Sequence, residues 1–214
     1  MLVFVPGYDS ATRSNLSIAN DFELDANDIF LNQNADRNEL FKFINQMDSI
    51  FIMSHGGKNA IFYDGDKEAI NCQDATSFAN KNFFVFACHT ATNLGKIMAD
   101  NRNVWWGYTG AISAPDSEQE VREIVKPIFK YVLDNFHLVT YDSNPSISEV
   151  LVEIKVLCDT ANEQLDSLNT NDDLNYFDTK LCLEHFWNRL RIWYKDGILE
   201  PMKHPHAPSP FLFD

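Results

Sequence analysis

Two residues with catalytic side chains, His55 and Cys88, follow two apolar segments of this chain. The first segment spans residues 51–53 and the second spans residues 83–87. Apolar runs of this length are typical of buried parallel strands, and ligands bind at the C-terminal edge of such sheets. A thiol needs a base within hydrogen-bonding reach to become a thiolate near neutral pH. The spacing therefore predicts a His–Cys dyad across two neighbouring strand ends.

The residues that follow each side chain support this interpretation. Gly56 and Gly57 come directly after His55, so the backbone can turn tightly and a substrate can approach. After Cys88, residues 90–93 lead into an expected helix at 94–99, whose N-terminal partial charge would lower the pKa of the thiol. The alternative is structural: cysteine is among the most buried residue types, and a histidine before two glycines can be a turn residue. The matched placement at two strand ends favours catalysis.

At these residues the sequence resembles the caspase-like cysteine peptidases, and among them the CHAT-type bacterial branch. The resemblance rests on Ser-His-Gly at 54–56, Ala-Cys-His-Thr at 87–90 and Val-Trp-Trp-Gly-Tyr-Thr-Gly at 104–110. It covers roughly the first 135 residues. It implies peptide-bond hydrolysis, with His55 as general base and acid and Cys88 as nucleophile. The backbone N–H groups of Gly56 or Gly57 and of Cys88 would stabilise the oxyanion.

The resemblance also implies a substrate pocket built by the loop after residue 107. Tyr108, Thr109 and Asp116 are its candidate substrate-binding residues, and relatives that cut after Arg or Lys place a carboxylate there. The competing interpretation is a helix cap, because Asp116-x-x-Gln119 and Ser117-x-x-Glu120 are both capping-box patterns. The sequence favours the cap for Asp116.

Composition and charge narrow the class of protein. The chain has 214 residues, 45% of them hydrophobic, enough for one sizeable core with an annex. Its formal net charge of -14 without a stripe of Lys and Arg disfavours nucleic acid as a partner. The same charge could attract a basic peptide, although solubility explains it as well.

The apolar and cysteine patterns bear on the location. No apolar run is long enough to cross a membrane, and the apolar run after Met1 is too short for a signal-peptide core. The four cysteines have unrelated spacings, which argues against a disulfide framework or a zinc site: Cys72, Cys88, Cys158 and Cys182. We therefore expect a cytoplasmic protein with no cofactor and no metal.

The order of elements predicts an α/β fold, a caspase-like doubly wound, mostly parallel sheet flanked by helices. Apolar and β-branched patterns predict strands at 2–5, 28–31, 50–53, 82–87 and 103–107, and helices at 10–20, 37–46 and 117–135. Residues 59–70 predict a hairpin with an Asp-Gly turn, which could line a substrate groove or cover the sheet edge.

We divide the chain into a catalytic core at 1–140, a helical annex packed on it at 141–197, and an extended proline-rich tail at 198–214. The annex is expected to hold helices at 146–165 and 176–195, separated by an acidic, Asn-rich loop at 169–175. The second helix is apolar on more than one face. This favours burial between layers over a face that waits for a partner. The tail could pack along the domain, dock to another protein or occupy the substrate groove.

The sequence thus predicts a cysteine endopeptidase of protein or peptide substrates. Only about 15 residues separate Cys88 from the next strand, which leaves no room for the cleavable linker of caspases proper. We therefore expect control by a protein activator. The resemblance also suggests a role in bacterial defence. The alternative function is a catalytically idle caspase-like protein-binding module.

Overall fold

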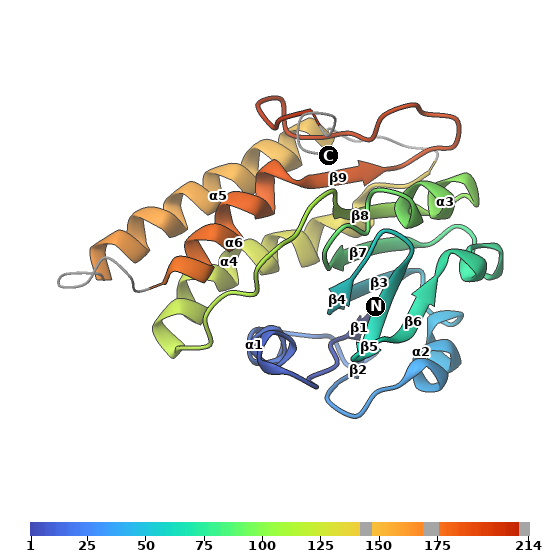
Figure 1. The fold of residues 1–214 in the computed structure, drawn as a ribbon, viewed down its shortest axis with the longest axis horizontal. Coiled ribbons are helices and arrows are strands. Elements are labelled where there is room, and N and C mark those ends of the chain that lie inside the picture. Colours follow the sequence, from blue (N-terminus) through green and yellow to red (C-terminus); the bar gives the residue numbers. More distant parts are fainter. Residues whose placement is uncertain (142–146, 169–175, 210–214) are drawn as a thin grey trace.

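The central layer of the protein is a six-stranded sheet (Figure 1). In the computed structural model, residues 1–141, 147–168 and 176–209 are described. The strand order is β2-β1-β3-β7-β8-β9, and every neighbouring pair is parallel except β8 and β9. The strands are β1 (Leu2–Phe4), β2 (Ile29–Leu31), β3 (Ser49–Met53), β7 (Asn82–Phe86), β8 (Val104–Tyr108) and β9 (Leu190–Trp193).

Helices cover both faces of this sheet. The helices are α1 (Ser10–Ala19), α2 (Arg37–Ile44), α3 (Leu94–Asp100), α4 (Gln119–Asn135), α5 (Ile147–Leu168) and α6 (Phe177–Asn188), with 3-10 turns at Cys72–Ser77 and Phe136–Leu138. One hydrophobic cluster joins α1, α4, α5 and α6 to one face of the sheet. A second cluster joins α2 and α3 to the other face. The predicted α/β class with a mostly parallel sheet is therefore confirmed.

Burial on both faces explains why the strands are almost wholly apolar. Side chains alternate between the two clusters along each strand, as the two-residue period of a strand requires. Phe51, Phe84 and Trp106 lie in the first cluster, while Ile50, Phe83 and Trp105 lie in the second. No face of the central strands therefore needs polar residues.

The register places three strand ends at one edge of the sheet. Phe4 of β1 pairs with Ile52 of β3, and Met53 of β3 pairs with Phe86 of β7. The residues that follow β1, β3 and β7 consequently leave the sheet on the same side. This edge carries the candidate site.

The predicted hairpin is confirmed and gains a third strand. β5 (Ala60–Asp64) and β6 (Lys67–Asn71) pair in antiparallel fashion around Gly65, whose φ is 57°. The short strand β4 (His55–Gly56) pairs with β5, with His55 opposite Phe62. The hairpin therefore fixes the backbone of the histidine just beyond the edge of the main sheet.

The expected second annex helix is wrong in its last part. Helix α6 ends at Asn188, and Leu190–Trp193 forms strand β9, antiparallel to β8. The edge of β8 offers unpaired backbone groups to this apolar segment, and the Trp193 indole donates a hydrogen bond to the Ala91 carbonyl at 2.7 Å. A strand from the expected annex thus completes the sheet of the core.

The first annex helix, α5, packs against α4 and α6, with buried residues spaced along one stripe. Its predicted cap at Ser146 and the predicted loop at 169–175 lie outside the described residues. Across the described ranges we find no helix that is both long and apolar enough to span a membrane.

The described part of the tail has no helix, packs along β9 and turns at residues 205–207. The backbones of Met202 and Ile192 exchange two hydrogen bonds of 2.9 Å. The Arg191 guanidinium donates to the Pro208 carbonyl at 2.7 Å. Residues 198–209 therefore follow the edge of the sheet; 210–214 lie outside the described part of the chain.

Candidate active site

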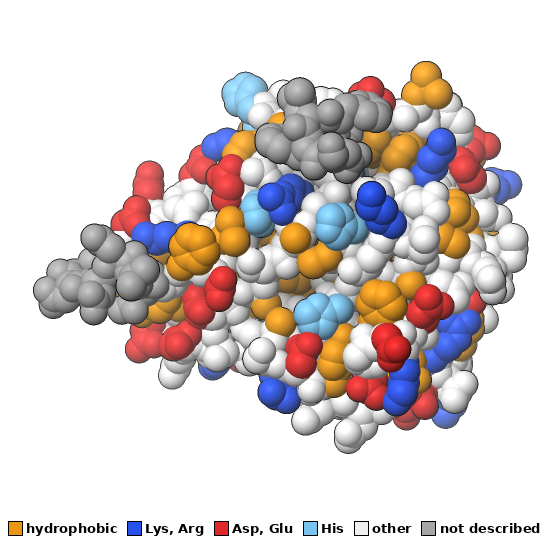
Figure 2. All heavy atoms as spheres, viewed as in Figure 1, with side chains coloured by type: hydrophobic (Ala, Val, Ile, Leu, Met, Phe, Trp, Pro, Cys, Tyr) orange, Lys and Arg blue, Asp and Glu red, His pale blue; other side chains and the backbone are white. Residues whose placement is uncertain are grey.

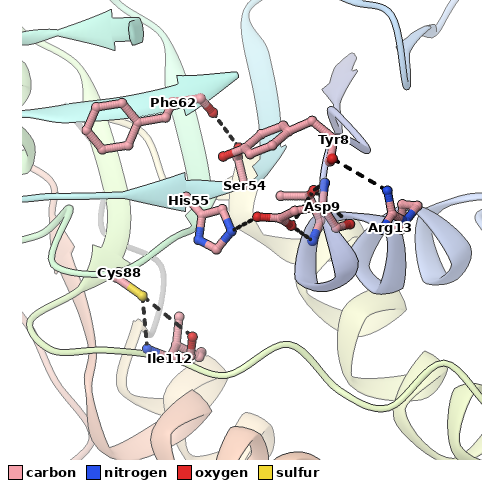
Figure 3. Close-up of polar contacts among 9 residues, drawn as sticks. Tyr8, Asp9, Arg13, Ser54, His55, Phe62, Cys88 and Ile112 are labelled. Atoms are coloured by element: carbon pink, nitrogen blue, oxygen red, sulfur yellow. Dashed lines mark hydrogen bonds and ion pairs between the residues drawn. The ribbon is translucent and has the colours of Figure 1, made fainter. Parts of the chain in front are cut away.

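The Cys88 side chain lies in a loop that begins where β7 ends. Cys88 is half-buried, and its sulfur accepts a hydrogen bond from the Ile112 N–H at 3.3 Å. Its S–H lies 3.6 Å from the Ile112 carbonyl oxygen (Figure 3). The loop turns sharply because His89 has a φ of 60° and its N–H donates to the Gly110 carbonyl. The thiol is thus held at the sheet edge and reachable from solvent.

Helix α3 confirms the helix predicted after Cys88 and begins, as expected, at Leu94. Five residues therefore separate the thiol from the first helical residue. The effect of a helix dipole falls off within about one turn, so α3 is not the group that would activate this thiol.

The His55 imidazole has a carboxylate partner that the sequence prediction missed. Its Nε2 lies 2.7 Å from the Asp9 Oδ2. The side chains are 42% and 41% exposed, so both are reachable from solvent. Asp9 follows β1 and caps the N-terminus of α1 in a capping box with Thr12. The signal for it was present: an Asp-x-x-Thr cap pattern directly after a strand that neighbours β3.

Hydrogen bonds keep the Asp9 carboxylate ionised. Burial by itself would raise the pKa of Asp9, but the Thr12 N–H and hydroxyl and the His55 imidazole together hold this pKa below its ordinary value. An ionised carboxylate can only accept hydrogen bonds, so Nε2 of His55 is the donor and carries a proton. In the neutral imidazole the second ring nitrogen, Nδ1, then holds the free lone pair.

Gly56 brings the His55 strand against the Cys88 loop. A Cβ atom at Gly56 would lie 2.7 Å from the Thr90 methyl, 2.8 Å from the Cys88 carbonyl oxygen and 2.9 Å from the Ala87 Cβ. These neighbours cannot move freely, so only glycine permits this close approach. His55 and Cys88 are therefore on touching segments.

Gly57 differs from its expected role as an oxyanion donor. Its N–H donates a 2.8 Å hydrogen bond to the Ala60 carbonyl within the hairpin. This donor is already used, so the backbone N–H groups of Gly56 and Cys88 remain as candidates.

The imidazole lies between the Asp9 carboxylate and the Cys88 thiol in Figure 3. His55 is hydrogen-bonded to Asp9 and Cys88 to Ile112, and the described residues show no hydrogen bond between imidazole and thiol. Catalytic hydrogen bonds often form only once substrate is bound. The arrangement places a carboxylate, an imidazole and a thiol in the order that a cysteine nucleophile with an oriented base would need.

A cavity of about 390 Å³ opens beside this site, between α1 and the loop that holds Ile112. Asp116 lies in its wall, which also includes Ser10, Ser14 and Asp178. The Asp116 carboxylate accepts a hydrogen bond of 2.6 Å from the Thr179 hydroxyl. The wall of the cavity therefore holds two carboxylates, and it also includes Ile112, whose backbone contacts the Cys88 thiol.

The favoured interpretation of Asp116 as a helix cap is wrong. Helix α4 begins at Gln119 after Glu118, and no side chain caps it. Thr179 of α6 engages the Asp116 carboxylate instead, and the Asp116 N–H donates to the same hydroxyl at 2.8 Å. A partner from 63 residues further along the chain cannot be read from a local cap pattern.

Tyr108 and Thr109, the other two predicted substrate-binding residues, do not line the cavity that contains Asp116. Tyr108 is 0% exposed and its ring packs against Phe86 and Phe186, so it belongs to the core and cannot contact a substrate. Thr109 is half-buried and lines a different cavity, beside Arg189. Tyr108 is the last residue of β8, and the alternation of side chains along this strand turns its ring into the core. The sequence prediction ends the strand at residue 107 and places Tyr108 in the loop that follows.

The other cysteines are poorer nucleophiles than a half-buried thiol beside a histidine. Burial raises the pKa of Cys182 and raises that of Cys158 well above the ordinary value. Burial and the nearby Glu68 raise the pKa of Cys72. All four cysteines are free. In the described ranges, no cluster of three His, Cys, Asp or Glu side chains could hold a metal ion.

Comparisons with known proteins place the fold. A solved structure described as "Structure of Protease" is similar to this chain, with a TM-score of 0.53 and 11% sequence identity. The match covers 95% of this chain and 48% of that one, so this chain spans about half the length of the solved protein. No protein-family model matches the sequence. No curated protein matches it either. The similarity is one of fold, the fold of a protease.

Asp9 gives a prediction that separates catalysis from folding. Asp9→Asn should lower kcat/KM of a reaction that uses His55 and Cys88 by about 10- to 10²-fold, because the amide no longer stabilises a protonated imidazole. We expect less than the ~10⁴-fold of buried triads, because both side chains are largely solvated. Asparagine is as good a helix cap as aspartate, so thermal unfolding should stay unchanged. Asp36→Asn, at the cap of α2, is the matched control. Equal activity of the two variants would remove Asp9 from the site.

Proposed function

We propose that this protein is a cysteine peptidase of caspase-like type that hydrolyses peptide bonds. The observation that carries the proposal is the carboxylate-oriented His55 at a strand end adjoining the loop of a half-buried, reachable thiol, Cys88. The protease-like fold supports hydrolysis of peptide bonds as the chemistry.

In the proposed reaction, Nδ1 of His55 takes the proton of the Cys88 thiol, and the thiolate attacks the carbonyl carbon of the scissile bond. The backbone N–H groups of Gly56 and Cys88 are the proposed donors to the oxyanion. The intermediate collapses to a thioester while the imidazolium gives its proton to the leaving amine. Water, deprotonated by His55, then hydrolyses the thioester and returns the thiol. Asp9 holds the imidazole in the tautomer that this cycle needs.

The cavity at Asp116 is the proposed pocket for the substrate residue before the scissile bond. Two carboxylates line it, those of Asp116 and Asp178, so a basic side chain fits its charge. A basic side chain would pair with these carboxylates, whereas an acidic or apolar one would not, and this difference would give the pocket its discrimination. We therefore propose cleavage after Arg or Lys.

A library of fluorogenic peptides that differ at this position tests both proposals. The wild-type chain should cleave peptides with Arg or Lys before the scissile bond. Asp116→Asn should reduce kcat/KM for these peptides by about 10- to 100-fold while keeping the acceptor for Thr179. Glu118→Gln removes one charge from the same loop outside the cavity and is the control. A preference for apolar or acidic residues would return Asp116 to a structural role.

We also propose that a protein partner activates this enzyme. The segment between β7 and β8 is filled by the Cys88 loop and α3, which leaves no linker whose cleavage could switch the enzyme on. Cytoplasmic location is an expectation from the apolar and cysteine patterns, and a role in bacterial defence is an expectation from the resemblance. If no peptide is cleaved with or without candidate activators, the result would favour the alternative function, a catalytically idle protein-binding module.

A further inference from the structure

A second cavity, lined in part by His89, the residue after Cys88, has the opposite charge. Its volume is about 320 Å³, and its wall includes His89, His185, Asn188, Arg189, Arg191 and Pro208. None of the residues that line it is Asp or Glu. Figure 2 shows His and Lys or Arg side chains gathered in the middle of the molecular face that it draws. In a chain of net charge -14, this is a local concentration of positive charge.

Unpartnered polar atoms are concentrated in this wall. His185 Nδ1, Asn188 Oδ1 and Arg191 Nε are buried, and each lacks a hydrogen-bond partner among the described residues. Buried polar atoms in folded proteins almost always have partners, and an exception calls for an explanation such as a ligand or an ion. Two of these three atoms, His185 Nδ1 and Arg191 Nε, can donate a hydrogen bond, so a ligand with acceptor oxygens in the cavity would account for them.

Arg191 is the central residue. It is 1% exposed, and its terminal nitrogens donate to the carbonyls of Asn188, Leu190 and Pro208 at 2.7 to 2.9 Å. These bonds hold the guanidinium in place, but they bring no negative charge. Burial consequently lowers the pKa of Arg191 to about 10. A buried cation without a carboxylate partner is destabilising, and an anionic ligand would offset this cost.

The neighbouring groups are also arranged for an anion. Arg189 donates to the Ala111 carbonyl, which leaves further N–H groups of its guanidinium for a ligand. Burial, and then the charge of Arg189, lowers the pKa of His185 to about 4, so this imidazole is neutral at pH 7 and can donate one N–H. A purely structural role, fixing the tail through Pro208, accounts for the Arg191 terminal nitrogens but not for Nε or His185.

We propose that this cavity binds the phosphate group of a small phosphorylated molecule. Donors on different elements, at Arg189, Arg191 and His185, suit an anion with several oxygens, and arginine is the preferred partner of phosphate. The volume is sufficient for a phosphate with an attached group such as a nucleoside. The proposal goes beyond peptide cleavage and does not depend on it. A ligand here would touch the loop 109–111, directly before Ile112, which contacts the Cys88 thiol.

Calorimetric titration of the full chain at pH 7 and low salt tests the proposal. The ligands are inorganic phosphate, AMP, adenosine and succinate. Phosphate and AMP should bind, while adenosine, which lacks the anion, should not. Arg189→Gln and Arg191→Met should each raise the Kd of AMP by about 10- to 100-fold. Arg122→Gln is the control, because Arg122 lies on α4, pairs with Asp21 and does not line the cavity; this variant should leave the Kd unchanged.

Circular dichroism establishes that each variant is folded. Methionine matches the length of the buried arginine stem, and Arg189 is only partly buried, so Arg189→Gln decides the outcome if Arg191→Met fails to fold. No measurable binding of phosphate or AMP, or the same Kd in wild type and Arg189→Gln, would overturn the proposal. Succinate binding as tightly as phosphate would overturn the phosphate class. None of these outcomes depends on peptidase activity.

Discussion

Cys88→Ala should abolish peptide cleavage, with a loss of kcat on the order of 10⁴- to 10⁶-fold. The reason is that no other thiol lies beside a histidine at the sheet edge in the described structure, so nothing can replace the nucleophile. Cys88 is half-buried and makes only weak sulfur contacts with the backbone of Ile112. The variant should therefore fold with an unchanged melting temperature.

Alkylation provides a measurement that needs no substrate. At mildly acidic pH, iodoacetamide should label Cys88 before the other three cysteines, because burial raises the pKa of Cys72, Cys158 and Cys182. Mass spectrometry of tryptic peptides gives the extent at each site. Cys72→Ala, which removes the only other partly exposed thiol, is the matched control and should keep full activity. Preferential labelling of Cys72 would contradict the assignment of the nucleophile.

His55→Ala should reduce kcat/KM by about 10²- to 10⁴-fold while the fold stays intact. The imidazole is 42% exposed and contributes little packing beyond its contact with the Tyr8 ring, whose centroid lies 5.8 Å away. Its loss removes the base that Asp9 orients. Rates of a fluorogenic peptide and thermal unfolding of the same samples separate the two effects.

His206→Ala is the control for this experiment, because His206 is exposed and lies in the tail along β9. Combining His55→Ala with Asp9→Asn adds a sharper measurement. If Asp9 acts only through His55, the double variant should be no slower than His55→Ala alone. Full activity of folded His55→Ala would mean that another histidine is the base, and unfolding would mean that His55 is structural.

Local pattern in the sequence was sufficient to place His55 and Cys88. The apolar segments before them could only be buried strands, and strands of a parallel sheet end at the same edge in register. Strand β3 (Ser49–Met53) pairs in parallel register with β7 (Asn82–Phe86), and this register brings the two strand ends together. The Asp-Gly hairpin was likewise specified by turn chemistry, which acts over a few residues.

Contacts between distant residues were decided only by the tertiary structure. Asp9 and His55 are 46 residues apart, and Asp116 and Thr179 are 63 apart, so neither pairing leaves a periodic signal. In both cases a polar side chain had a local role available as a helix cap; Asp9 keeps that role, and Asp116 does not.

The same reason explains strand β9 and the cavity at Arg191. Residues 190–193 follow a helix without a strong break in pattern, but pairing with the free edge of β8 outweighs helix propensity there. The strand then turns the Arg191 side chain into the protein rather than toward solvent. The positions of the strand ends could be predicted from the sequence, because the apolar pattern of a buried strand is complete within a few residues. Tertiary packing determined which polar groups meet, because hydrogen bonds and charges act through space and not along the chain.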